Sequence, residues 1–170
     1  MSRKIEVEFT LSGLEKLRVF LTEKRKDAKE LPEKITKEVL KEGESLILEN
    51  MRKQNIREAK GELFRSIFSE QDKEKGVVGV QAEYAKFVEY GTGVVGKGSP
   101  HPDPPEEWEY DVPSEHKTLD GGWVYYDEHA GQFRFTYGAV SKPFMYHTYY
   151  DLRDRSMEIA KRIVGELIDD

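Results

Sequence analysis

The sequence contains no cysteine among its 170 residues. This absence excludes disulfide bonds, thiolate catalysis and every zinc site that depends on cysteine ligands. The sequence also lacks a run of about 18 apolar residues, so it predicts no transmembrane helix. Its first 13 residues lack the apolar core of a signal peptide. We therefore expect a protein that is made and kept in the cytosol of the producing cell, without a membrane partner.

Basic charge is scarce in the second half of the chain. The net charge of −6 divides into +2 over residues 1–75 and −8 over residues 76–170. Affinity for nucleic acid phosphates depends on clustered basic charge, so we expect no specific nucleic-acid binding. The chain is 35% charged and 37% hydrophobic, which is typical of a polar globular protein. Its length suits one domain with one large excursion.

Hydrophobic spacing in the first third of the chain predicts one strand and two helices. Residues 4–10 alternate between apolar and charged side chains, as a half-buried strand does. Ser12 and Glu15 form a capping box, which predicts that a helix starts at about residue 13. We expect Pro32 to end this helix and to begin a second one, whose apolar stripe continues to about residue 53.

Shorter elements are expected in the middle of the chain. Residues 61–70 predict a turn of helix that leads into a strand, and residues 76–81 predict a strand that returns beside it. Residues 82–90 have the apolar spacing of a short amphipathic helix, which Gly91 would end.

Residues 94–142 form an insert of different composition. They hold five of the seven prolines and both tryptophans, and residues 122–138 alternate aromatic side chains around a polar turn, as a β-hairpin does. Helical spacing resumes after Pro143 and predicts a long terminal helix. The predicted fold class is therefore α+β, in a single domain over residues 1–170. It comprises an N-terminal strand and two helices, a small mainly antiparallel sheet, the hairpin insert and the C-terminal helix.

Residues 91–96 read GTGVVG and match the dinucleotide fingerprint G-x-G-x-x-G. That fingerprint needs a buried strand before it and a helix after it, whose amides hold the pyrophosphate. Here a predicted helix precedes the glycines, and a proline-rich loop without a helix follows them. We therefore expect no nucleotide and no other cofactor. Gly91 and Gly93 more simply end a helix and allow a sharp turn.

Histidines are the candidates for metal chemistry: His101 with Asp103, and His116, His129 and His147 elsewhere in the chain. His101 and Asp103 could converge with His129, but no spacing matches a known zinc pattern. We assign no catalytic, metal or cofactor residue. A small metal-dependent hydrolase built on these side chains remains an open alternative.

The aromatic side chains of the insert are the most unusual feature of the sequence. Two interpretations stay open: a satellite core beneath the insert, or an interface in which Trp and Tyr anchor a partner. The residues are Trp108, Tyr110, Trp123, Tyr125, Tyr126, Phe133, Phe135 and Tyr137.

Three motifs resemble one known family. They are Gly61-Glu-Leu63 with Ser66-Ile67, the stretch YAKFVEYGTG at 84–93, and KPFM at 142–145. Together with the order of predicted elements, they resemble the gene-product-ten-like proteins of tailed bacteriophages, also known as tail-completion or head–tail joining proteins. The likeness covers most of the chain. The insert is similar to the version found in phages and prophages of Gram-positive bacteria.

The resemblance implies a non-enzymatic virion protein that is made in the host cytoplasm. Such proteins form a ring, often a hexamer, at the neck, where the tail is completed and joined to the head. The implied partners are other copies of the chain, the connector or adaptor proteins, and the tail terminator or tail-tube proteins. The implied ring leaves a passage for DNA. The resemblance carries over a set of fold-forming and subunit-contact positions: Tyr84, Phe87, Glu89, Gly91, Thr92, Gly93, Pro143 and Phe144.

A third function stays open beside the ring protein and the hydrolase. It is a cytosolic adaptor module that binds other proteins and remains monomeric. For the ring protein, we expect the insert to contact adjacent subunits or neck proteins, because loops beyond about 12–15 residues usually carry function or disorder and disorder is poor in aromatic residues.

Overall fold

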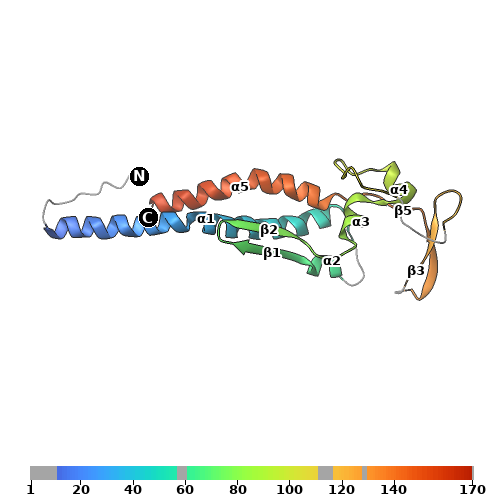
Figure 1. Cartoon of the computed structure of the whole chain (residues 1–170), viewed down its shortest axis with the longest axis horizontal. Helices are drawn as coiled ribbons and strands as arrows, with labels where there is room; N and C mark the ends of the chain where they lie inside the picture. The colour runs from blue at the N-terminus through green and yellow to red at the C-terminus, as the bar shows by residue number, and fades with distance from the viewer. Residues whose placement is uncertain (1–10, 57–60, 111–116, 128–129, 170) are drawn as a thin grey trace. The chain divides into compact units, whose positions relative to one another are not determined.

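The structure, a computed structural model, describes residues 11–56, 61–110, 117–127 and 130–169 of the chain (Figure 1). Its fold class is α+β, as the sequence predicts. The elements follow in the order α1 (Leu11–Lys53), α2 (Glu62–Arg65), β1 (Ile67–Asp72), β2 (Lys75–Val80), α3 (Ala85–Tyr90), α4 (Gly93–Gly98), β3 (Trp123–Asp127), β4 (Gln132–Thr136), β5 (Gly138–Ala139) and α5 (Phe144–Asp169).

The chain forms two compact units. The first comprises Met1–Glu44, Ser69–Val78 and Asp151–Asp170, and the second comprises Ser45–Phe68 and Gly79–Tyr150. No helix among the described residues is long and apolar enough to cross a membrane.

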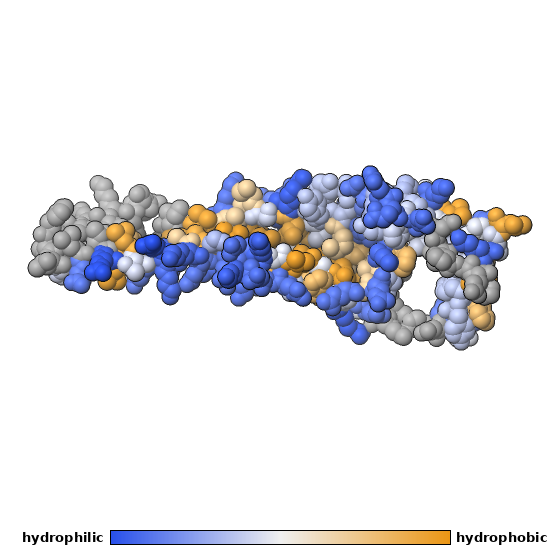
Figure 2. Space-filling view, in the orientation of Figure 1, coloured by the Kyte–Doolittle hydropathy of each residue, from blue (hydrophilic) through white to orange (hydrophobic). Residues whose placement is uncertain are grey.

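The first unit is built on antiparallel segments of α1 and α5. The Lys24 ammonium donates to the Leu167 carbonyl at 3.1 Å, and Arg155 pairs with Glu42 at 2.5 Å. These two contacts show that the helices run in opposite directions. Hydrophobic side chains gather between hydrophilic ones along these helices (Figure 2). Gly43 is the point of closest packing, because a Cβ there would lie 2.8 Å from Val78 of β2.

Helix α1 runs without a break through Pro32, so the expected division into two helices is wrong. A proline inside a helix removes one hydrogen bond to the carbonyl four residues earlier. That carbonyl belongs to Ala28, and both Ala28 and Pro32 are exposed, so water can satisfy the free oxygen. Packing on either side of the proline, at Lys24 and at Gly43, stabilises the continuous helix more than the lost bond destabilises it.

Replacing Pro32 with Ala tests the continuous helix. Pro in a helix interior costs about 3 kcal/mol relative to Ala, so Pro32→Ala should raise the free energy of unfolding by about 1–3 kcal/mol. Urea unfolding followed by circular dichroism measures the change, and Lys34→Ala, at an exposed position on the same helix, should change it by less than about 0.5 kcal/mol. A proline that began a second helix would give no gain.

The second unit holds the most deeply buried side chains. Asn50 on α1 donates to Thr148 on α5 at 3.3 Å, and the Thr148 hydroxyl donates to the Phe144 carbonyl at 2.7 Å. This polar contact lies within an apolar core. Among the described residues, the largest fully buried side chains are Leu46, Ile47, Met51, Leu63, Phe144 and Thr148.

Among the described residues the strands form two separate two-stranded sheets, β1–β2 and β3–β4. They correspond to the small sheet and to the hairpin insert that the sequence predicts. The helical turn before β1, the hairpin in the insert and the long terminal helix are confirmed. Ser12 already lies inside α1, so it is not the helix cap that the sequence predicts. The predicted strand at residues 4–10 lies outside the described residues.

Candidate functional site

The carboxylate of Glu89 connects three segments of the second unit. It lies at the end of α3 and is 5% exposed. Its Oε2 accepts the backbone N–H of Met145 at 2.9 Å, and its Oε1 accepts that of Tyr146 at 2.9 Å. Oε1 also lies 3.0 Å from Nε2 of His101. We call this arrangement of one carboxylate, two amides and one imidazole the Glu89 clamp.

The two amides belong to the first turn of α5. First-turn amides have no partner inside their own helix, and the N-terminal end of the helix carries partial positive charge. A nearby Ser, Thr, Asp or Asn usually caps such an end. Here Lys142 and Pro143 precede the helix, so a carboxylate from more than 50 residues earlier caps it instead. The Ser141 hydroxyl donates to the Glu89 carbonyl at 2.6 Å and strengthens this junction.

His101 is 5% exposed, and both of its ring nitrogens are engaged. Nδ1 accepts the backbone N–H of Asp103 at 3.0 Å, so the proton of the neutral ring belongs on Nε2, which donates to Glu89. Neither nitrogen is left for a metal ion or for proton abstraction. Among the described residues no three His, Asp or Glu side chains gather as metal ligands, and His116 and His129 lie outside those residues.

The glycines of the EYGTG motif pack against the segment that precedes α5. Gly91 and Gly93 have φ angles of 77° and 63°, which L side chains rarely adopt. A Cβ at Gly91 would lie 2.7 Å from the backbone nitrogen of Ser141. Thr92 pairs with Ala139 through an isolated antiparallel bridge, and the Ala139 N–H donates to the Thr92 hydroxyl at 3.1 Å. Glycine at positions 91 and 93 therefore allows both the sharp turn and the close packing of the two backbone segments.

Helix α4 begins at Gly93, so the expectation that this motif opens no helix is wrong. The pairing of residues 92–93 with β5 directs the following residues into a short helix despite its three glycines. The segment still forms no phosphate cradle. A helix, not a strand, precedes it, and the amides of Gly93 and Val95 donate to the carbonyls of Tyr110 and Tyr137.

Part of the aromatic set forms a satellite core. Trp123 is 9% exposed, and the ring of Trp108 lies 4.9 Å from that of Tyr90 and 5.9 Å from that of Phe87. Tyr110 meets Trp108 edge to face at 6.5 Å. The rings of Tyr90 and Tyr146 flank His101, as shown by centroid distances of 4.8 and 5.3 Å. These contacts place the loop after α4 over the Glu89 clamp.

The other part of the set lies on the β3–β4 hairpin and is exposed. Pairing places Val124 opposite Phe135 and Tyr126 opposite Phe133 on one face of the hairpin. Tyr137 follows on that face, two residues beyond Phe135. We call this surface the aromatic face. Its ring residues and their exposed fractions are Tyr126 53%, Phe133 72%, Phe135 47% and Tyr137 42%.

The opposite face of the hairpin carries its charge. Arg134 pairs with Asp127 at 2.9 Å there, next to Tyr125, which is 42% exposed. Trp123 is on the same side and is buried. In a solvated antiparallel sheet, the apolar face usually packs on the core and the charged face meets water. Here the buried Trp123 lies on the charged face, and the aromatic face is exposed to water.

The base of the aromatic face is held by the preceding loop. The Tyr137 hydroxyl donates to Asp120 at 2.6 Å, and Thr118 donates to the same carboxylate. Hydrogen bonds from Thr118 and then Tyr137 lower the pKa of Asp120, while the bond to Asp120 raises the pKa of Tyr137. Phe135 covers Gly122, where a side chain would collide with its ring. Among the described residues, the outer half, at Tyr126 and Phe133, is held by the edge contact of its two rings at 5.2 Å.

The remaining motif residues take structural positions. Phe144 is fully buried at the start of α5, and Tyr84 and Phe87 lie at α3, where Phe87 is 40% exposed. Sequence reasoning missed the partnership of Glu89 with His101. Lys86 on the same short helix is charged too, and 12 residues separate Glu89 from His101, so no local pattern signalled the pair.

No known family model matches the chain, and no curated protein or solved structure matches it either.

Neutralising Glu89 should destabilise the second unit. Glu89→Gln replaces one acceptor oxygen with an NH2 group that would face the donors of the clamp, and a buried donor left unsatisfied costs about 1–3 kcal/mol. We expect the free energy of unfolding to fall by about 2 kcal/mol or more. Glu83→Gln, at an exposed position just before α3, is the matched control and should change it by less than about 0.5 kcal/mol. Equal effects of the two substitutions would show that the clamp contributes nothing.

Proposed function

We propose that this chain is a structural virion protein of a tailed bacteriophage or prophage, which forms a ring at the neck, completes the tail and joins it to the head. In this proposal it has no catalytic activity. Its partners are other copies of itself, the connector or adaptor proteins on the head side, and the tail terminator or tail-tube proteins.

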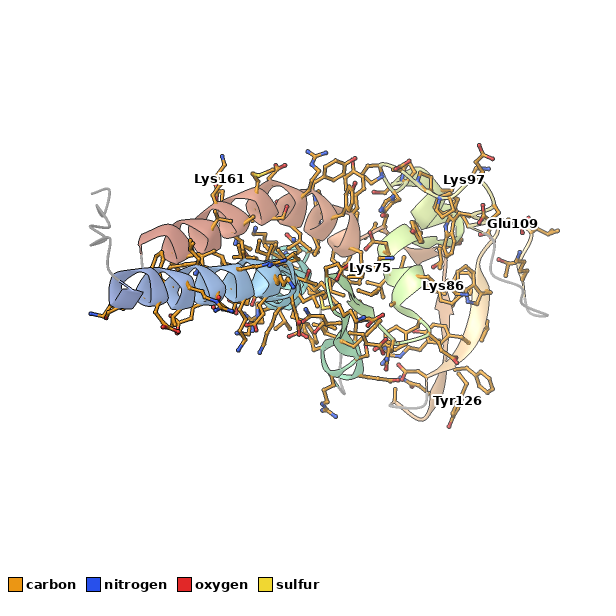
Figure 3. The ribbon with its side chains drawn as sticks, turned by 60° about the vertical axis from the view of Figure 1, so that its left-hand side comes forward. Lys75, Lys86, Lys97, Glu109, Tyr126 and Lys161 are labelled. Carbon is orange, nitrogen blue, oxygen red and sulfur yellow. The ribbon has the colours of Figure 1, made fainter. Side chains whose placement is uncertain are left out.

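The observation that carries the proposal is the outward aromatic face of the β3–β4 hairpin. An isolated two-stranded hairpin is marginally stable, and an exposed patch of this kind marks an interaction site on a soluble chain. Tyr126 lies near the turn end of the β3–β4 hairpin and points away from the rest of the ribbon (Figure 3). Assembly proteins need such a surface, and Trp, Tyr and Phe are the residues that anchor protein interfaces.

The Glu89 clamp gives a physical reason for the two motifs that carry the sequence resemblance. The motifs at 84–93 and 142–145 are separated by the insert, yet the clamp joins them directly. A junction of this kind lets the insert extend from a fixed base. It also gives the motif residues Glu89, Gly91 and Phe144 a role in holding a binding surface, without any reactive chemistry.

Of the two other functions, the hydrolase fits the described residues less well. A hydrolase built on His101 would need a free ring nitrogen, and both are engaged. A monomeric adaptor could also use the aromatic face, and the mass of the purified protein separates it from a ring: the adaptor has the mass of one chain, the ring that of several.

Loss of the aromatic face should prevent assembly without unfolding the chain. We expect that a phage lacking this gene accumulates separate heads and tails, and that the Tyr126→Ser, Phe133→Ser double variant fails to restore complete virions. Trp123 stays unchanged because it is buried. Circular dichroism checks the fold, and electron microscopy counts joined particles.

The matched control is Tyr149→Ser, which removes an aromatic ring that is 63% exposed on α5. It should restore joining to the wild-type level. Complete virions in the absence of the gene would refute the proposed function. If the double variant restored complete virions, the aromatic face would have no role in joining heads to tails.

A further inference from the structure

The second unit also carries an apolar groove of about 280 Å³ beside α3. Phe87 and Val88 of α3 line it together with Ala139 and Val140. Val140 is 44% exposed and Phe87 is 40% exposed, so the groove presents apolar surface to solvent. Among the described residues Lys142 is the one charged residue that lines the groove, and its ammonium donates to the Asn55 carbonyl at 2.9 Å.

We infer that this groove receives the aromatic face of a second copy of the chain, so that Tyr126 and Phe133 of one subunit lie against Phe87 and Val140 of the next. This inference rests on the proposed function and specifies the contact that would build the ring. The groove supplies an apolar site for aromatic rings, and the aromatic face supplies rings that are 42–72% exposed.

The area of the aromatic face and the charges beside the two surfaces suit a contact between copies of the chain. Four rings of about 200 Å² each, half exposed, offer roughly 400 Å², about half of what each partner contributes to a standard interface. Asp120 lies at the base of the aromatic face, while Lys142 lines the groove and Lys86 lies on α3 with its ammonium 5.1 Å from the Phe87 ring centre. Opposite charges at the edges of an apolar contact help to set its register.

The chain itself links the two surfaces. Phe133, Phe135 and Tyr137 lie on the aromatic face, and Ala139 and Val140, which follow directly, line the groove. The groove and the aromatic face are different patches of one unit, so their contact is heterologous. Contacts of that kind close into rings when the rotation between neighbours divides a full turn.

The absence of cysteine makes this contact directly testable by disulfide cross-linking of the full chain. Phe133→Cys places a thiol on the aromatic face, and Val140→Cys places one in the groove. Mixing the two single variants under mild oxidation should give covalent dimers. Neither variant alone should dimerise, because a heterologous contact does not bring identical positions together. A chain carrying both thiols should give a ladder of multimers on a denaturing gel.

The control pairs Phe133→Cys with Tyr149→Cys, which is more exposed than Val140 but lies on α5, outside the groove. This pair should give less than about a tenth of the dimer. Equal yields from the two pairs, no dimer from either, or a disulfide within one chain of the doubly substituted variant would overturn the inference. Self-dimers of Phe133→Cys would indicate a two-fold contact and would overturn it too.

The cross-linking result and the proposed function can fail separately. Joined virions that need the gene but contain no cross-link between positions 133 and 140 would refute the groove contact alone. Efficient cross-linking, together with complete virions in the absence of the gene, would refute the neck function and leave the groove contact intact.

Discussion

The buried carboxylate of Glu89 is the interaction on which the second unit depends. It accepts the first two free amides of α5 and the imidazole of His101, and so connects α3, the loop after α4 and the last helix. A buried carboxylate is costly unless hydrogen bonds satisfy it, and here three donors do so. The favourable interaction with the positive end of the helix adds to that compensation.

This junction explains how an insert of nearly 50 residues can extend from a short motif. Gly91 and Gly93 bring their backbone against residues 138–141, and the rings of Tyr90 and Trp108 pack beside His101 of the clamp. The hairpin that leaves this base has little apolar packing of its own at its outer end. Its exposed rings are then available to a partner, while the hairpin remains attached to a well-packed unit.

Local patterns in the sequence predict most of the elements. Apolar spacing locates α1 to its end at Lys53, and it locates α3, the β3–β4 hairpin and α5. The prediction that Pro32 ends a helix is wrong because the sequence shows only the local cost of a proline inside a helix. The packing of α1 against α5, which outweighs that cost, is not visible in the sequence. Helix α4 is unexpected for a similar reason, because its start depends on pairing with β5, more than 40 residues later.

The candidate site is harder to predict because its contacts are distant in sequence. The aromatic residues of the insert are evident from composition, but only the strand register separates the exposed face from buried Trp123. Glu89 is one of 33 acidic residues, and nothing in the sequence distinguishes it as the cap of a helix that begins 55 residues later. Distant capping of this kind becomes visible only in three dimensions.

Hydrogen exchange at the amides of Met145 and Tyr146 tests the role of Glu89 most directly. First-turn amides of a helix ordinarily exchange fast because they have no partner within the helix. If the Glu89 carboxylate holds them, both should exchange as slowly as core amides of α5 in the wild-type chain. Fast exchange at both positions, with slow exchange further along α5, would contradict the clamp.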